Sequence, residues 1–184
     1  MKQPLVVLGL SLVLVATLLA TEQALPPGIM VLDARPAPEL RLEDIDGKAY
    51  DLADARGHWV FVHFWATWCG PCRREMPTIE RMTSALGDSP LEIIMVNTAE
   101  TEDEVFTFLA VVAPDAVPLM DTDGLVTERW QPRGLPATFL VDPAGILRYL
   151  ALGGREWDTA PYLAFLSRLA SPEPVQKTVN GAPP

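Results

Sequence analysis

The two cysteines are the feature of this sequence that most restricts its fold and chemistry. The chain has no others, and Cys69 and Cys72 are separated only by Gly70 and Pro71. A disulfide stabilises mainly by restricting the unfolded chain, and this effect is small when the closed loop is so short. Structural zinc normally has four ligands, and the two histidines of the chain offer no second ligand pair at the usual spacing. The pair is therefore expected to work as a reversible dithiol.

The residues around the cysteines predict a strand that leads directly into a helix. Residues 59–64 are a continuous aromatic and β-branched run, typical of a central buried strand. Residues 71–86 have a helical pattern that ends at a glycine. Cys69 then lies where the helix begins, and the free N–H groups and the dipole there favour its thiolate. Cys72 lies one turn deeper, where it can attack a mixed disulfide at Cys69.

The remaining pattern predicts one α/β domain over residues 38–170. Strands are expected at 39–42, 48–52, 92–96, 117–120, 138–141 and 146–151, with one helix at 102–112 and a last helix that is capped by Asp158 and runs to about residue 169. The first two strands flank an Asp-Gly turn and form a hairpin. This order gives a mixed central sheet with helices on both faces and an N-terminal β-hairpin extension.

The two ends of the chain have a different composition. Residues 1–24 contain an apolar run of about 24 Å as a helix, somewhat short of the ~30 Å hydrocarbon core. We interpret residues 4–21 as an anchor in the inner membrane; a cleaved signal peptide is the alternative, although no good cleavage site is present. Residues 25–37 are rich in proline and predict a spacer, and residues 171–184 predict a disordered tail. Either reading of residues 1–24 places the domain outside the cytoplasm. The formal net charge of -10 argues against nucleic acid as a partner.

The sequence Phe-Trp-Ala-Thr-Trp-Cys-Gly-Pro-Cys-Arg-Arg-Glu-Met-Pro at residues 64–77 resembles the TlpA/ResA branch of extracytoplasmic thiol-disulfide oxidoreductases. The resemblance extends over about residues 36–169 and implies a thioredoxin-like fold with no cofactor. It implies a redox cycle through a mixed disulfide at Cys69, and the Gly-Pro dipeptide favours reduction. Oxidised exported protein thiols, apocytochrome c among them, are the implied substrates. The implied electron donor is a membrane protein of the DsbD/CcdA type, and the implied location is the periplasm.

The same resemblance assigns a substrate-binding region beside the cysteines. The sequence Gly-Leu-Pro-Ala-Thr-Phe at residues 134–139 matches the segment that carries the cis-proline of the family, which is Pro136 here. The backbone of Leu135 is then expected to bind an extended substrate peptide. Trp68, Gly70 and Pro71 are expected at the rim of this region.

Two further residues are candidates for proton transfer. Glu75 lies on the same helix face as Cys72, and the branch often has a glutamate here, suited to exchanging protons with Cys72. The alternative is a glutamate that merely favours the first turn of the helix. His63 occupies the strand position where cytoplasmic thioredoxins have a buried aspartate. It is either a proton acceptor below Cys72 or a neutral, hydrogen-bonded core histidine.

Other functions remain open at this point. A chaperone for copper or another soft metal would use the same thiolates, but it would usually have another cysteine spacing and a distant histidine. A peroxidase would share only the scaffold, because the sequence before Cys69 lacks the peroxidatic pattern. Trp130 is a further candidate for the wall of a substrate groove.

Overall fold

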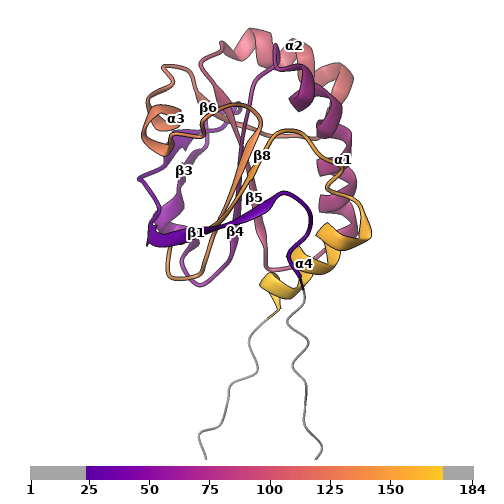
Figure 1. The fold of residues 1–184 in the computed structure, drawn as a ribbon. Helices are drawn as coiled ribbons and strands as arrows, with labels where there is room; N and C mark the ends of the chain where they lie inside the picture. The colour runs from indigo at the N-terminus through magenta and orange to yellow at the C-terminus, as the bar shows by residue number, and fades with distance from the viewer. Residues whose placement is uncertain (1–23, 172–184) are drawn as a thin grey trace, which may run out of the picture.

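The computed structural model describes residues 24–171, which form a six-stranded sheet covered by helices (Figure 1). The strand order is β1-β8-β7-β4-β5-β6, in which β4, β5 and β6 run parallel and the other neighbours are antiparallel. The strands are β1 (Ile29–Pro36), β4 (Val60–Trp65), β5 (Glu92–Thr98), β6 (Leu119–Asp121), β7 (Ala137–Val141) and β8 (Ile146–Leu152). The separate hairpin consists of β2 (Arg41–Glu43) and β3 (Ala49–Asp51).

Helices lie on both faces of the sheet, as the sequence predicted. They are α1 (Gly70–Leu86), α2 (Glu102–Val112), α3 (Leu125–Trp130) and α4 (Ala160–Ala170), with a short 3-10 helix at Leu52–Ala55. Phe61 and Trp65 of β4 face the side covered by α1, α2 and α4. Val62 and Phe64 face the opposite side, where α3 and the short helix pack. All six residues of β4 are buried, because this strand lies between two layers.

Local sequence signals set the ends of the helices that flank the site. Helix α1 begins after Cys69, has a proline in its first turn where no N–H partner is lost, and ends at Gly87 with a φ of 52°. Helix α2 begins after Thr101, whose side chain accepts the N–H of Glu104, while the Glu104 carboxylate accepts the N–H of Thr101. The expected bounds of α2 are confirmed.

Two expectations for the secondary structure of the described residues are wrong, and one helix has no expected counterpart. Residues 29–36, expected as a spacer, form edge strand β1 against β8. Only Ile29 of β1 is buried, so the sequence of the strand shows little apolar pattern. Its proline lies at the edge of the sheet, where a missing N–H is tolerated. Asp158 does not cap α4, because its carboxylate binds Arg81; Thr159 precedes the helix without a side-chain cap. Helix α3 was not expected. It begins where the carboxylate of Asp121 accepts N–H groups of the first turn.

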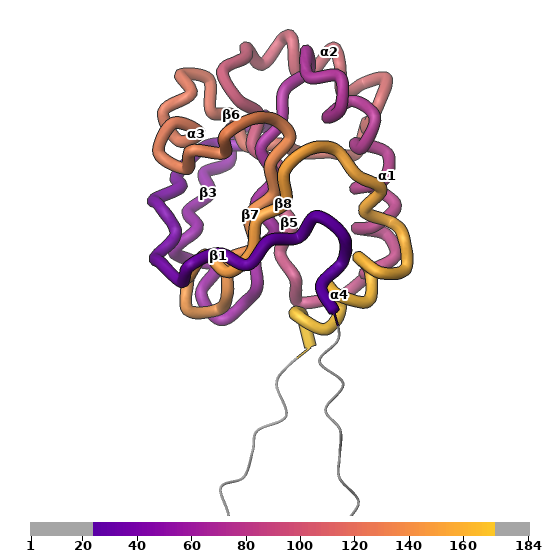
Figure 2. Tube along the Cα trace, viewed as in Figure 1, coloured from indigo at the N-terminus to yellow at the C-terminus, as the bar shows by residue number. Residues whose placement is uncertain are grey.

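The described chain begins and ends at one end of the domain (Figure 2). Pro27 lies beside α4, where its carbonyl oxygen accepts a hydrogen bond of 2.7 Å from the hydroxyl of Tyr162. The expected anchor and the expected tail fall on residues 1–23 and 172–184, outside the described residues. Within residues 24–171, no helix has the length and apolar character needed to cross a membrane.

Candidate active site

A disulfide joins Cys69 to Cys72 at the start of α1, with 5.2 Å between the Cα atoms. Cys69 is 4% exposed and Cys72 is completely buried. The helix geometry explains this difference, because Cys69 precedes the first turn while Cys72 already faces the core. Of the two cysteines, only Cys69 therefore has any exposure to solvent.

The first turn of α1 provides a hydrogen-bond donor to the outer sulfur. The N–H of Cys72 donates to Cys69 Sγ at 3.2 Å, and Cys69 is the N-cap residue of the helix. Free N–H groups and the positive end of the helix dipole stabilise negative charge at such a position. The expected position of Cys69 at the helix start is confirmed, and the surroundings favour its thiolate once the disulfide is reduced.

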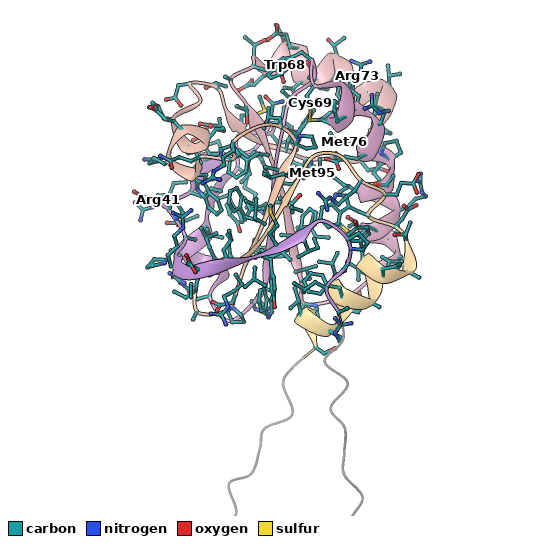
Figure 3. All side chains as sticks on the ribbon, viewed as in Figure 1. Arg41, Trp68, Cys69, Arg73, Met76 and Met95 are labelled. Atoms are coloured by element: carbon teal, nitrogen blue, oxygen red, sulfur yellow. A yellow bond between two sulfur atoms is a disulfide. The ribbon has the colours of Figure 1, made fainter. Side chains whose placement is uncertain are left out.

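The rim of the site contains one large exposed aromatic residue. Trp68 is 69% exposed and lies with Cys69 and Arg73 where α1 begins, whereas Arg41 lies on a distant side of the domain (Figure 3). Trp65 is fully buried and packs against Phe108, with 5.7 Å between the ring centroids. Trp68 thus lies at the rim, as expected, and Trp65 lies in the core.

The loop before β7 lies against the cysteines. The Leu135–Pro136 peptide bond is cis, as expected. Leu135 is half-buried and packs against the apolar cluster that contains both cysteines. The carbonyl oxygen of Pro136 accepts the N–H of Gly153 at 2.9 Å. Gly154 lies so close to the motif that a Cβ there would be 3.0 Å from the Pro71 carbonyl oxygen.

A buried polar network lies behind the disulfide. Glu75 is 3% exposed, and one of its carboxylate oxygens accepts the N–H of Arg155 at 3.0 Å. Its other oxygen is 3.1 Å from Nε2 of His63, a close approach that is not aligned as a hydrogen bond. Nδ1 of His63, which is fully buried, lies 2.9 Å from the hydroxyl of Thr138. The inward position expected for Glu75 is confirmed, and His63 is its neighbour.

A second buried carboxylate, which we did not predict from the sequence, contacts the loop that precedes Cys69. Glu100 is 7% exposed and accepts hydrogen bonds from the N–H of Thr67 at 2.7 Å and from Nδ2 of Asn97 at 2.8 Å. Asn97 pairs with Trp65 between the parallel strands β5 and β4. Polar residues at the carboxyl ends of neighbouring parallel strands are a general signal of a site, and this signal was available in the sequence.

Two other expectations concern the surroundings of the site. Trp130 is buried against Phe64 and Phe139 and therefore belongs to the core, so its expected place in a substrate groove is wrong. Among residues 24–171, no three His, Cys, Asp or Glu side chains come together as a metal site, and the metal-chaperone alternative gains no support.

A hollow of about 650 Å³ beside the β2–β3 hairpin includes neither cysteine. The reactive sulfur is thus at a surface rim and outside that hollow.

Comparison with known proteins agrees with this geometry. Residues 34–150 match the model of the AhpC/TSA family. The thiol-disulfide oxidoreductase ResA of Bacillus subtilis is 36% identical over 59% of this chain and 61% of its own length. ResA of Geobacillus thermodenitrificans is 33% identical over 64% of this chain and 67% of its own length. The alignment thus spans less than two thirds of the B. subtilis protein.

A solved structure supports the same assignment of the fold. The crystal structure of a thiol:disulfide interchange protein DsbE from Chlorobium tepidum superimposes with a TM-score of 0.68 and 25% identity. The match covers 77% of this chain and 100% of that chain. The chain therefore belongs to the AhpC/TSA family, as a ResA-like member of the thioredoxin superfamily.

Proposed function

We propose that this protein is a thiol-disulfide oxidoreductase that reduces disulfides of exported proteins through Cys69 and Cys72. The observation that carries the proposal is the unequal exposure of the two joined cysteine residues, 4% for Cys69 and none for Cys72, at a helix N-terminus. The ResA relatives support the same reaction class.

In the proposed cycle, the thiolate of reduced Cys69 attacks one sulfur of a substrate disulfide. A mixed disulfide forms and the other substrate sulfur leaves as a thiolate. The thiolate of Cys72 then attacks the sulfur of Cys69, which breaks the mixed disulfide and releases the second substrate thiolate. The substrate gains two electrons and Cys69–Cys72 becomes a disulfide, the form present in the structure. A dithiol of a DsbD/CcdA-type membrane donor returns the two electrons.

The rim residues provide the proposed contacts with the substrate. Trp68 offers exposed aromatic surface beside the reactive sulfur. Leu135 and Pro136 would hold an extended peptide through backbone groups beside Gly70 and Pro71. Packing of Leu135 against the cysteine cluster supports this placement.

Glu75 and His63 provide the proposed route for a proton to and from Cys72. Both are buried, and Glu75 follows Cys72 by one helical turn on the inward face of α1. The hydroxyl of Thr138 can donate to or accept from Nδ1 of His63, so this contact persists whether or not Nδ1 carries a proton. Glu75→Gln tests the role, because an unchanged reduction rate and an unchanged pH profile would exclude it.

The proposed location is outside the cytoplasm, with residues 4–21 in the inner membrane. The first described residues enter the domain beside α4, at the end opposite Cys69 (Figures 1 and 3). A tether at that end leaves the reactive rim free for exported proteins, with apocytochrome c as one substrate. N-terminal sequencing tests the anchor: a mature protein that begins near residues 21–25 would exclude it.

A trapping experiment tests the reaction. Cys72→Ser should accumulate a mixed disulfide with exported proteins at Cys69, while the matched Cys69→Ser variant should trap none, because its remaining thiol is buried. Equal trapping by both variants would contradict the assigned order of the sulfurs. For the direction, we expect a reduction potential nearer the ~-270 mV of thioredoxin than the ~-120 mV of DsbA. A potential near the DsbA value would indicate an oxidase.

A further inference from the structure

The peptide backbone of Thr67 is held from both sides. Its N–H donates to the carboxylate of Glu100 at 2.7 Å, and its hydroxyl also contacts that carboxylate. Its carbonyl oxygen accepts a hydrogen bond of 3.2 Å from the guanidinium of Arg73, which in turn lies 4.8 Å from the ring centroid of Phe108. Only Trp68 separates Thr67 from Cys69, so these hydrogen bonds hold the backbone immediately before the reactive cysteine.

Glu100 is itself held in place by contacts with the end of the sheet. It is 7% exposed and accepts a 2.8 Å hydrogen bond from Nδ2 of Asn97, which is fully buried at the end of β5. Ala99, between them, has a φ of 55°, and its N–H donates to the carbonyl oxygen of Asp121. The carboxylate is thus fixed by the sheet, whereas the residues it holds belong to a connection between β4 and α1.

We propose that Glu100 is a positioning residue for the reaction of Cys69: it fixes the loop of residues 66–68 so that Cys69 stays at the helix cap and Trp68 at the rim. This inference rests on the proposed function, in which Cys69 is the attacking sulfur. Exchange between sulfurs requires a defined approach, and a misplacement of about 1 Å can cost about a hundredfold in rate. The Cys72 N–H to Cys69 Sγ contact of 3.2 Å depends on the same loop position.

This role depends on the length of the Glu100 side chain and not on its charge. In Glu100→Gln, the amide oxygen can still accept from Thr67 N–H and Asn97 Nδ2, and the amide NH₂ can donate to the Thr67 hydroxyl, which turns to accept. In Glu100→Asp the charge is kept, but the carboxylate is retracted by one methylene and no longer reaches Thr67. Gln should therefore behave like wild type, and Asp should not.

The experiment measures two properties of the reduced protein. One is the second-order rate constant for reduction of 5,5′-dithiobis(2-nitrobenzoate), and the other is the pH profile of Cys69 alkylation by iodoacetamide. We expect Glu100→Asp to lower the rate constant by about tenfold or more and to shift the alkylation midpoint to higher pH. Glu100→Gln should stay within about threefold of wild type, because its contacts reproduce the same positioning. Wild-type behaviour of Asp, or loss of activity in Gln equal to that in Asp, overturns the proposal.

Three further variants separate positioning from stability. Thr67→Val removes only the hydroxyl contact from an otherwise isosteric side chain and should lower the rate severalfold; an unchanged rate counts against the proposal. Glu102→Gln removes an exposed charge two residues along the chain and should change nothing. Val141→Ala weakens the core opposite Val60, at the far end of β4 from the site. If it lowers the rate as much as Glu100→Asp, general destabilisation explains both results and the proposal fails.

The outcome also distinguishes the two proposals from one another. A wild-type protein that reduces no disulfide would overturn the proposed function itself. A wild-type protein that is active, together with Glu100→Asp of equal rate and equal pH profile, would leave the function in place and remove only the role of Glu100.

Discussion

The contact between His63 and Glu75 predicts a large non-additive effect on stability. Both side chains are at most 3% exposed, and their facing atoms are 3.1 Å apart. His63→Leu removes the polar neighbour of the buried Glu75 carboxyl, which then has only the N–H of Arg155, and a buried polar group that loses its partner costs about 1–3 kcal/mol. Glu75→Leu costs about as much for the pair and also leaves that N–H without its acceptor, about 1–3 kcal/mol more.

The double variant removes both polar side chains together. It keeps only the cost of the unpaired N–H of Arg155, about 1–3 kcal/mol, since apolar residues of similar volume replace the pair without a large penalty. The sum of the two single costs should therefore exceed the cost of the double variant by about 2–6 kcal/mol.

Urea denaturation of the oxidised protein at pH 7 measures these free energies of unfolding. Tryptophan fluorescence is a suitable signal, because Trp65, Trp130 and Trp157 are buried. Costs that add within about 0.5 kcal/mol would refute the reasoning, because independent sites behave in that way. A matched control is Val62→Ala in the same strand, whose side chain faces the other side of the sheet and should combine additively with Glu75→Leu.

Three further predictions concern residues near the site. Thr101→Ala should lower the free energy of unfolding by about 1 kcal/mol in urea denaturation, because the N-cap of α2 loses its side-chain acceptor. Hydrogen bonds from the N–H of Thr101, and then from its hydroxyl, hold the pKa of Glu104 below its usual value. The difference in free energy of unfolding between wild type and Glu104→Gln should therefore be largest near pH 7 and disappear as the pH falls through that lowered pKa. A difference that grows in acid would contradict this. Gly154→Ala should destabilise the oxidised protein by about 1–3 kcal/mol, since its Cβ would press on the Pro71 carbonyl oxygen, and a thermal melt equal to wild type would show that the loop simply yields.

The parts of the fold with a strong local signal were predictable from the sequence. The continuous apolar run of β4 and the Cys-Gly-Pro-Cys start of α1 define a strand and a helix without tertiary information. Strand β1 lacks such a signal, because it lies at an edge with one buried residue and ends in a proline. Its pairing with β8 depends on residues more than a hundred positions away, which no local pattern records.

In the candidate site, too, the residues with a local sequence signal were predictable and their distant partners were not. Cys69, Cys72 and the inward face carrying Glu75 follow from helical spacing, which is a local property. The partners of these groups do not: the N–H of Arg155 and the hydroxyl of Thr138 come from distant segments, and every residue except proline has a backbone N–H. Glu100 was missed for a related reason, since the expected strand ended at residue 96 and left the glutamate in an unassigned loop.

These distant partners also connect the two halves of the site. Thr138 follows Pro136 by two residues in β7, and Arg155 follows Gly153, whose N–H binds the carbonyl oxygen of Pro136. The buried network therefore joins the helix that carries the cysteines to the loop on which the substrate is proposed to lie. At the centre of this arrangement lies His63, whose Nδ1 contacts the hydroxyl of Thr138 and whose Nε2 faces Glu75 at 3.1 Å. A histidine suits this position, since it can hold either one proton or two while both ring nitrogens keep a polar neighbour.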